Sequence, residues 1–118
     1  MDRSLRILHL EDEPDYCGLV KALLEKDGLA ADLVLVGDLK GFVAALDKGG
    51  FDIILADYRL PTCTGIEALR EARQRCPGTP FVLVSGTIGE PAAIEAMKCG
   101  ATDYVLKQWP ERLAPTRA

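Results

Sequence analysis

A short apolar run that ends in a carboxylate is the first feature of this sequence that could do chemistry. The run covers Ile53 to Ala56, Asp57 follows directly, and Pro61 comes four residues later. Such a run is typical of a strand buried on both faces of a parallel sheet. Asp57 would then stand at the carboxyl end of that strand, where open α/β sheets place their ligands. Because Asp also commonly caps a turn or a helix, this segment alone leaves both interpretations open.

Polar residues follow three further apolar runs of the chain. Glu11 and Asp12 come after the first run, Ser85 ends the fourth, and Lys107 ends the fifth. The carboxyl ends of parallel strands meet at one edge of a sheet, so these side chains would gather there around Asp57. Chance is a poor explanation for three acids, a hydroxyl and a lysine at four strand ends. The sequence therefore predicts a shared site at this edge.

Metal binding and phosphoryl transfer are the chemistry that this set would support. Three carboxylates within about 5 Å repel one another by roughly 3 kcal/mol per pair at an effective dielectric near 20. A cation relieves the repulsion, and hard oxygen ligands favour Mg²⁺, which often completes its shell with phosphate oxygens. A carboxylate beside Mg²⁺ and Lys107 can attack a phosphoryl group and hold it, with Ser85 donating a hydrogen bond. The acids from Glu11 to Glu13 could instead only favour a helix N-terminus.

Five strands alternating with four helices are needed to position these residues. The expected strands are Leu5–Leu10, Ala31–Val36, the run that ends at Asp57, Phe81–Val84 with Ser85 at its end, and Tyr104–Lys107. The expected helices begin at Pro14, Gly37-Asp38, Gly65 and near Pro91, and end before Gly28, Gly49, Pro77 and at Gly100. This alternation predicts a doubly wound parallel sheet in the order 2-1-3-4-5, with right-handed crossovers and helices on both faces.

The helix that begins near Pro91 differs from the other three. It is rich in alanine, and Ile94 and Met97 are its only large apolar residues. Few large contacts predict modest local stability, which would suit an element that moves.

Length and charge exclude several classes of function. The 118 residues correspond to one domain, 1–118, and the net charge of −4 comes with scattered Lys and Arg. No basic stripe is present to attract phosphate backbones, so we expect no direct nucleic-acid binding. No apolar run approaches the ~20 residues of a membrane helix. The first six residues lead directly into a strand, which is not the pattern of a signal peptide.

The four cysteines are widely spaced and accompany a single histidine. They form no C-x-x-C pair, so zinc binding has almost no support. A domain of this size with an ample core does not need disulfides. We therefore expect free thiols and a cytoplasmic protein.

Taken together, these motifs resemble the receiver domain of two-component response regulators over nearly all 118 residues. That family carries an acidic pair after its first strand, a phosphoacceptor Asp and its loop, a Ser/Thr position, and a Lys at the end of its last strand. The matching positions here are Glu11-Asp12, Asp57 with Leu60-Pro61 and Gly65, Ser85, and the segment from Gly100 to Lys107. The resemblance implies a flavodoxin-like fold and a phosphorylation-dependent signalling switch.

The resemblance also implies a role for each acid. Asp57 would accept a phosphoryl group from the phosphohistidine of a histidine kinase or phosphotransfer protein, with Lys107 beside it. Asp12, Asp57 and the backbone carbonyl of Arg59 would bind Mg²⁺, and Glu11 would act mainly through water. The domain would catalyse only its own phosphorylation and dephosphorylation, so it is not expected to be an enzyme with turnover.

Two further residues match the positions through which such domains respond to phosphorylation. Ser85 would move toward the phosphoryl group, and Tyr104 matches the aromatic switch position that is coupled to the Ser85 hydroxyl. The surface formed by the fourth helix and the fifth strand would then change and signal to an output domain or a downstream protein.

Two departures from the family pattern concern the end of the chain. The family often has Pro after its lysine, whereas Gln108 follows Lys107 here. The segment from Gln108 to Leu113 could begin a fifth helix, but Pro115 disfavours its interior and the helix looks truncated. The oligomeric state is therefore left open.

Two other classes of function remain as alternatives. One is a phosphorylation-independent interaction module of the same fold, although such domains usually lose an acid or the lysine and this chain keeps them all. The other is a Mg²⁺-dependent phosphatase with an aspartyl nucleophile. Those enzymes typically carry D-x-D after the first strand, whereas Asp12 is followed here by Glu13-Pro14.

Overall fold

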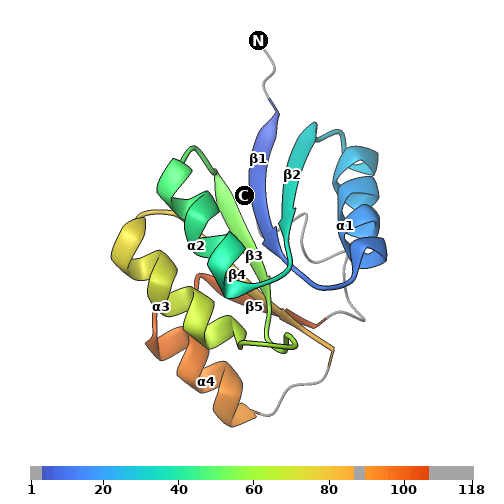
Figure 1. The fold of residues 1–118 in the computed structure, drawn as a ribbon. Helices are drawn as coiled ribbons and strands as arrows, with labels where there is room; N and C mark the ends of the chain where they lie inside the picture. Colours follow the sequence, from blue (N-terminus) through green and yellow to red (C-terminus); the bar gives the residue numbers. More distant parts are fainter. Residues whose placement is uncertain (1–3, 87–89, 107–118) are drawn as a thin grey trace.

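A five-stranded parallel sheet forms the centre of the molecule (Figure 1). The computed structural model describes residues 4–86 and 90–106. Its strands lie in the order β2-β1-β3-β4-β5. Their bounds are Leu5–Leu10 for β1, Ala31–Val36 for β2, Ile53–Asp57 for β3, Phe81–Ser85 for β4 and Asp103–Leu106 for β5. All four pairings are parallel, which confirms the predicted fold and strand order.

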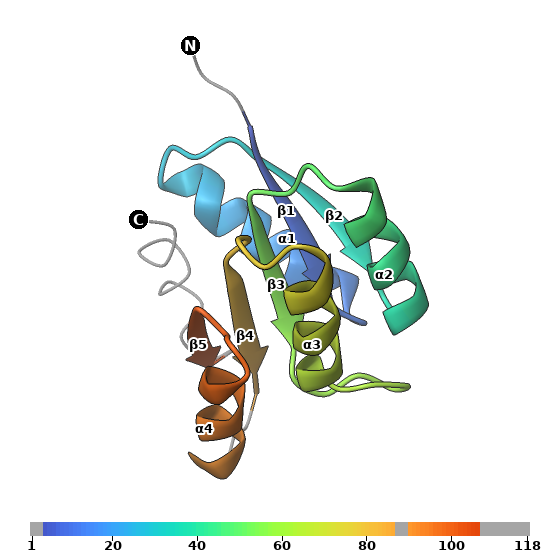
Figure 2. The ribbon, with the colours of Figure 1, turned by 90° about the vertical axis from the view of Figure 1, so that its left-hand side faces the viewer.

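Within residues 4–86 and 90–106, four helices cover the two faces of the sheet. They are α1, Pro14–Lys26; α2, Leu39–Lys48; α3, Gly65–Arg75; and α4, Glu90–Lys98. Figure 2 shows α2, α3 and α4 side by side on one face, with α3 in the middle, and α1 on the other face. The buried residues separate accordingly, because one cluster joins the sheet to α2, α3 and α4 and the second joins it to α1.

Strands β3 and β4 are buried along their whole length, as the apolar runs predicted. Their side chains alternate between the two clusters: Ile54 and Leu83 face α2 and α3, whereas Leu55 and Val84 face α1. The alternation follows from the two-residue period of a strand. Because both faces are covered, the two central strands form a rigid base for the residues at their carboxyl ends.

A few element bounds differ from the sequence-based expectation. Strand β5 begins one residue earlier, at Asp103, and α4 begins at Glu90. In α1, Leu19 shares the apolar periodicity but is 46% exposed, because Val20 and Leu24 occupy the centre of the buried face. The expected fifth helix and Lys107 lie outside the described residues.

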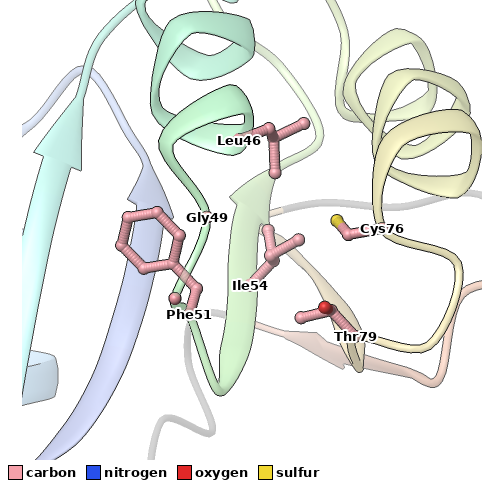
Figure 3. Close-up of a pocket in the computed structure, with 7 residues that line it drawn as sticks. Leu46, Gly49, Phe51, Ile54, Cys76 and Thr79 are labelled. Atoms are coloured by element: carbon pink, nitrogen blue, oxygen red, sulfur yellow. The ribbon is translucent and has the colours of Figure 1, made fainter.

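One cavity lies at the opposite edge of the sheet from Asp57. Its volume is about 50 Å³, and its walls come from the ends of α2 and α3 and the start of β3 (Figure 3). The lining residues are Leu46, Gly49, Gly50, Phe51, Ile54, Cys76 and Thr79. A space of this size has room for a few waters at most. Its position at the other edge of the sheet separates it from the site that the sequence predicts.

None of the helices in the described part of the chain has both the length and the apolar character required to cross a bilayer.

Candidate functional site

Glu11, Asp12 and Asp57 come together at the carboxyl edge of the sheet. Each offers one carboxylate oxygen, and these three oxygens lie within 4.8 Å of one another. The pairing of β1 with β3 ends at Leu10 and Ala56, so the acids that follow the two strands are neighbours. Glu11 and Asp57 are buried, at 1% and 6% exposure, whereas Asp12 is exposed. The cluster is thus open to solvent on one side only.

Backbone amides orient the two buried carboxylates. The Glu11 amide donates to the carbonyl of Val36 at 2.9 Å, which extends the pairing of β1 with β2 by one residue. The Glu13 amide donates to Oε2 of Glu11 at 3.1 Å. The amide of Arg59 lies 3.4 Å from Oδ1 of Asp57. Hydrogen bonds of this kind hold the direction of a carboxyl group.

The donor set fits a hard divalent cation. Three ionised carboxylates at this separation repel one another by roughly 3 kcal/mol per pair at an effective dielectric near 20. The negative charge of Glu11 also reaches α1, where burial raises the pKa of the Cys17 thiol and Glu11 raises it further, against a smaller opposing effect of Lys21. Oxygen ligands alone, with an exposed side for water, are the chemistry that Mg²⁺ prefers.

Gly65 allows α3 to begin directly against the end of the Asp57 strand. Its amide donates to the carbonyl of Tyr58 at 2.8 Å. A Cβ atom at this position would lie 2.6 Å from the Asp57 carbonyl oxygen and would also overlap the Leu83 side chain. No other residue type fits there without moving the strand end. Gly65 therefore helps to position Asp57, although it carries no side chain.

A capping box holds the start of α3, and the sequence analysis missed it. The amide of Glu67 donates to Oγ1 of Thr64 at 3.3 Å, and the amide of Thr64 donates to Oε1 of Glu67 at 3.0 Å. The spacing Thr-x-x-Glu is its sequence signature and could have identified it. The box fixes the far end of the loop that follows Asp57.

Arg59 lies in that loop with an exposed side chain. Its backbone forms an isolated antiparallel bridge with Thr64, which closes the loop on itself. The structure thus places the Arg59 amide toward the Asp57 carboxylate. The expected role of the Arg59 carbonyl as a metal ligand stays a prediction.

Ser85 and Tyr104 stand near each other on neighbouring strands. Ser85 ends β4 with 2% exposure, directly after Val84, which pairs with Asp57. Tyr104 is half-buried on β5 and pairs with Leu83. Burial raises the pKa of the Tyr104 phenol, and the nearby Ser85 hydroxyl opposes part of that rise. The two residues thus lie on neighbouring strands, and their coupling stays a prediction.

Of the seven predicted site residues, the structure brings together the three acids and places Arg59 and Ser85 on adjoining elements. Tyr104 lies one strand further along the sheet. The seventh, Lys107, is outside the described residues, so its place opposite Asp57 stays a prediction.

Comparisons with known proteins point to one family. The family model for the response regulator receiver domain matches residues 7–116. The transcriptional regulatory protein ZraR of Salmonella typhimurium is 31% identical over 104 residues, which are 88% of this chain and 23% of that protein. This chain therefore spans about a quarter of the length of that curated relative.

Solved structures show the same fold. A CheY-like receiver domain from Methanospirillum hungatei superposes with a TM-score of 0.84 at 24% identity, covering 96% of this chain and 90% of its own. The receiver domain of the sensor histidine kinase PA1611 from Pseudomonas aeruginosa superposes with a TM-score of 0.82 at 25% identity, covering 98% and 95%. The latter has a magnesium ion coordinated in its active site cleft.

One explanation accounts for three observations: the strand order, the acid cluster at the carboxyl edge of the sheet, and the match of the family model over residues 7–116. This chain belongs to the response regulator receiver domain family of two-component systems.

Proposed function

We propose that this domain is a phosphorylation-dependent signalling switch in which Asp57 accepts the phosphoryl group. The observation that carries the proposal is the cluster of Glu11, Asp12 and Asp57, with three carboxylate oxygens within 4.8 Å at the edge of a receiver fold. Asp57 is the member that ends a central strand: it pairs with Val84 of β4 and directly follows Ala56, which pairs with Leu10 of β1. A nucleophile needs such fixed placement because in-line attack tolerates little misalignment.

The same acids would hold Mg²⁺. Asp12 and Asp57 supply carboxylate oxygens, the Arg59 carbonyl is the proposed third ligand, and Glu11 is proposed to act through a water molecule. The magnesium-bound receiver domain of PA1611 supports this assignment by its similarity to the present fold. When bound, the ion supplies positive charge that neutralises the phosphoryl oxygens.

The reaction that the site supports is transfer between two protein side chains. A carboxylate oxygen of Asp57 forms a bond to phosphorus while the bond from phosphorus to the imidazole nitrogen of a phosphohistidine breaks. The electron pair of the broken bond stays on the imidazole, and the product is an acyl phosphate on Asp57. Lys107 and the Ser85 hydroxyl are proposed to bind the phosphoryl oxygens. Later attack by water on phosphorus returns the free carboxylate.

The response to phosphorylation would pass through Ser85 and Tyr104. A new dianionic group on Asp57 favours a position of Ser85 in which its hydroxyl donates to a phosphoryl oxygen. That movement would leave space toward which the half-buried side chain of Tyr104 moves. The surface of α4 and β5 would change as the population shifts between two states.

The partners follow from the proposed chemistry. A histidine kinase or a phosphotransfer protein would supply the phosphoryl group. The α4 and β5 surface would contact an output domain or a downstream protein. Direct nucleic-acid binding by the domain itself is not part of the proposal, because its net charge is −4.

Intact mass spectrometry tests the proposal directly. The 118-residue chain is incubated with acetyl phosphate or phosphoramidate, with and without Mg²⁺, beside Asp57→Asn and the control Asp47→Asn. Asp47 is an exposed acid of α2 outside the cluster. The expected result is a Mg²⁺-dependent gain of one phosphoryl group that hydroxylamine removes, present in the control and absent in Asp57→Asn.

Two other outcomes have distinct meanings. An adduct that persists in Asp57→Asn would assign the modification to another residue and overturn the role of Asp57. No adduct, no Mg²⁺ binding and no response to beryllofluoride would contradict the switch and leave an interaction module of the same fold.

A further inference from the structure

Helix α4 has little apolar anchoring. Among its described side chains, only Ala96 is fully buried, whereas Ile94 and Met97 are 47% and 49% exposed. A buried methyl group contributes far less than the larger side chains that anchor α2 and α3. Something other than apolar packing must therefore contribute to its position on the sheet.

The guanidinium group of Arg73 supplies an attachment at the C-terminal end of α4. This arginine belongs to α3, the neighbouring helix. Its Nε donates to the carbonyl of Gly100 at 2.9 Å, just after the last turn of α4. Its Nη1 donates to the carbonyls of Thr79 at 2.8 Å and Pro77 at 3.2 Å, in the segment between α3 and β4. One side chain thus joins the end of α4 to the segment that leads into β4.

Physical chemistry makes this a favourable arrangement. Hydrogen bonds from a charged donor are stronger than those between neutral groups. A positive charge at the C-terminal end of a helix is also attracted by the helix dipole. The planar fork of an arginine spreads its donors over three nitrogens in a fixed geometry, whereas the three donors of a lysine share one nitrogen.

Gly100 makes room for the guanidinium. Its φ of +102° lies in the left-handed region, where other residues are strained. A Cβ atom there would also lie 3.1 Å from Nε and 3.3 Å from Cδ of Arg73. Glycine at this position therefore serves both the turn after α4 and the close approach of Arg73.

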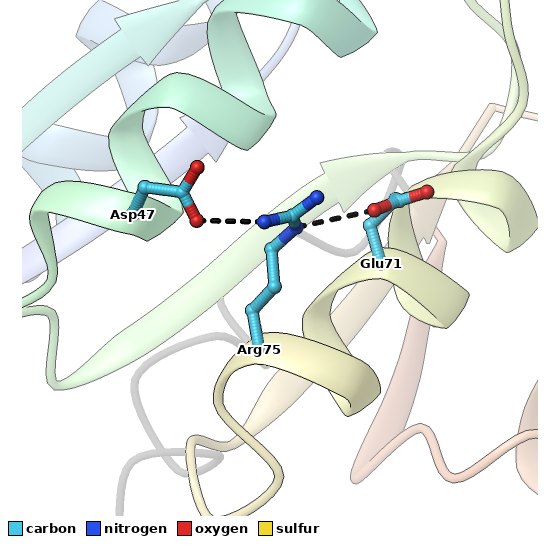
Figure 4. A network of polar contacts seen from close by, with 3 residues as sticks. All are labelled: Asp47, Glu71 and Arg75. Carbon is cyan, nitrogen blue, oxygen red and sulfur yellow. Dashed lines mark hydrogen bonds and ion pairs between the residues drawn. The ribbon is translucent and has the colours of Figure 1, made fainter.

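The other two arginines of α3 do not have this role. Arg70 approaches Glu95 of α4 at 3.8 Å, but both side chains are more than half exposed, and such pairs contribute little. Arg75 turns the other way and bonds to Asp47 of α2 at 2.7 Å and to Glu71 of its own helix at 3.2 Å (Figure 4). Both arginines are thus natural controls for Arg73.

We propose that Arg73 is a positioning residue that clamps the C-terminal end of α4 and favours the state of the domain described here. The second half of this statement rests on the proposed switch. In that switch the α4 surface has to change, and a clamp on α4 opposes the change. Loss of the clamp loosens α4 and makes the phosphorylated state easier to reach.

Hydrogen–deuterium exchange tests the clamp without any phosphoryl donor. The relevant amides close the end of α4: Cys99 to the Glu95 carbonyl, Gly100 to Met97 and Ala101 to Ala96. In Arg73→Met, which keeps an apolar stem, exchange of these amides is expected to rise about tenfold. Exchange in α1 and α2 of Arg73→Met is expected to stay within about twofold of the wild type. In the controls Arg70→Met and Arg75→Met, exchange at the end of α4 is also expected to stay within about twofold.

Arg73→Lys is the second variant, in case Arg73→Met does not fold. Lysine keeps the charge but lacks the separated, fixed donor nitrogens of the guanidinium group, so an intermediate rise in exchange is expected. Thermal unfolding monitored by circular dichroism identifies which variants are folded. Unchanged exchange at residues 99–101 in a folded variant would overturn the clamp.

A beryllofluoride titration in the presence of Mg²⁺ tests the second half of the proposal. Binding to Arg73→Met is expected to be about threefold to tenfold tighter than to the wild type. Equal or weaker binding, with raised exchange, would overturn the link to the switch while the clamp itself stands. No beryllofluoride binding by the wild type would instead contradict the proposed function, and the exchange result would still decide on the clamp.

Discussion

Two parts of one sheet face are held in different ways. Helices α2 and α3 bury large apolar side chains against β1, β3 and β4, among them Phe42, Leu46, Ile66 and Leu69. Helix α4, on the same face, buries Ala96 among its described side chains and is attached by Arg73 at its end. Large apolar contacts resist movement, whereas a few hydrogen bonds can break and re-form. Rigidity is therefore concentrated around the acid site and is low where the proposed signal would leave the domain.

Polar contacts reinforce the same contrast. Arg75 joins α3 to Asp47 of α2, and the Thr64–Glu67 capping box fixes the start of α3. Each is modest alone, because solvent screens an exposed ion pair and a cap satisfies only a few backbone groups. Together they add to a region that is already well packed around the Asp57 strand.

The largest expected effect comes from the well-packed part. Phe42 is fully buried in α2, and Phe42→Ala is expected to lower the free energy of unfolding by about 3–5 kcal/mol, because the ring leaves a cavity. Urea denaturation measures the change, with the slope m as a check that unfolding stays cooperative. A loss below about 1 kcal/mol would mean that α2 is held no more firmly than α4.

Thiol labelling gives the next effect in size. Cys63 is 7% exposed in the loop after Asp57, whereas Cys99 is half-buried at the end of α4. Burial, then the charges of Glu67 and Asp38, raise the pKa of Cys63. Near neutral pH, iodoacetamide is expected to modify Cys99 about tenfold faster than Cys63, as read by peptide mass spectrometry. Equal rates in the folded protein, with equal rates in urea, would remove the contrast between the two regions.

The raised pKa of Cys63 also makes the free energy of unfolding depend on pH. The folded state keeps the thiol proton to higher pH than the unfolded state does. Its contribution is therefore constant below the ordinary thiol pKa, and the unfolding free energy falls as pH rises through that value. Cys63→Ser, which does not titrate in this range, is the matched control for urea titrations at increasing pH.

The smallest expected effect belongs to the exposed face of α4. Ile94→Ala is expected to change the unfolding free energy by no more than about 0.5 kcal/mol, because Ile94 is 47% exposed. Urea denaturation alongside Phe42→Ala compares the two regions with a single method. A loss above about 2 kcal/mol would show that α4 is packed on a part of the protein beyond the described contacts.

The sequence predicted the fold and the acid cluster through one kind of signal. Apolar runs identified the strands, and the polar residues at the ends of these runs identified the edge. The parallel pairing then accounts for the meeting of Asp12 and Asp57, which are 45 positions apart in the chain. Fold and site followed together because in this architecture strand ends and site residues are the same positions.

Other features depend on contacts that the spacing of apolar residues along the chain does not reveal. Arg73 lies on a helix face like any charged residue, and the Gly100 carbonyl to which it donates is 27 residues away in the chain. The apolar pattern of α1 includes Leu19, but helix rotation on the sheet leaves that residue exposed. The Thr64–Glu67 box is a different case, since its spacing was visible in the sequence.

The strand order also has a consequence for what can move in such a domain. In the described sheet β5 is an edge strand, and its only partner is β4. It can therefore separate from β4 without breaking any pairing between the other four strands. A signalling movement of α4 and β5 would then cross one boundary in the sheet, the line between β4 and β5.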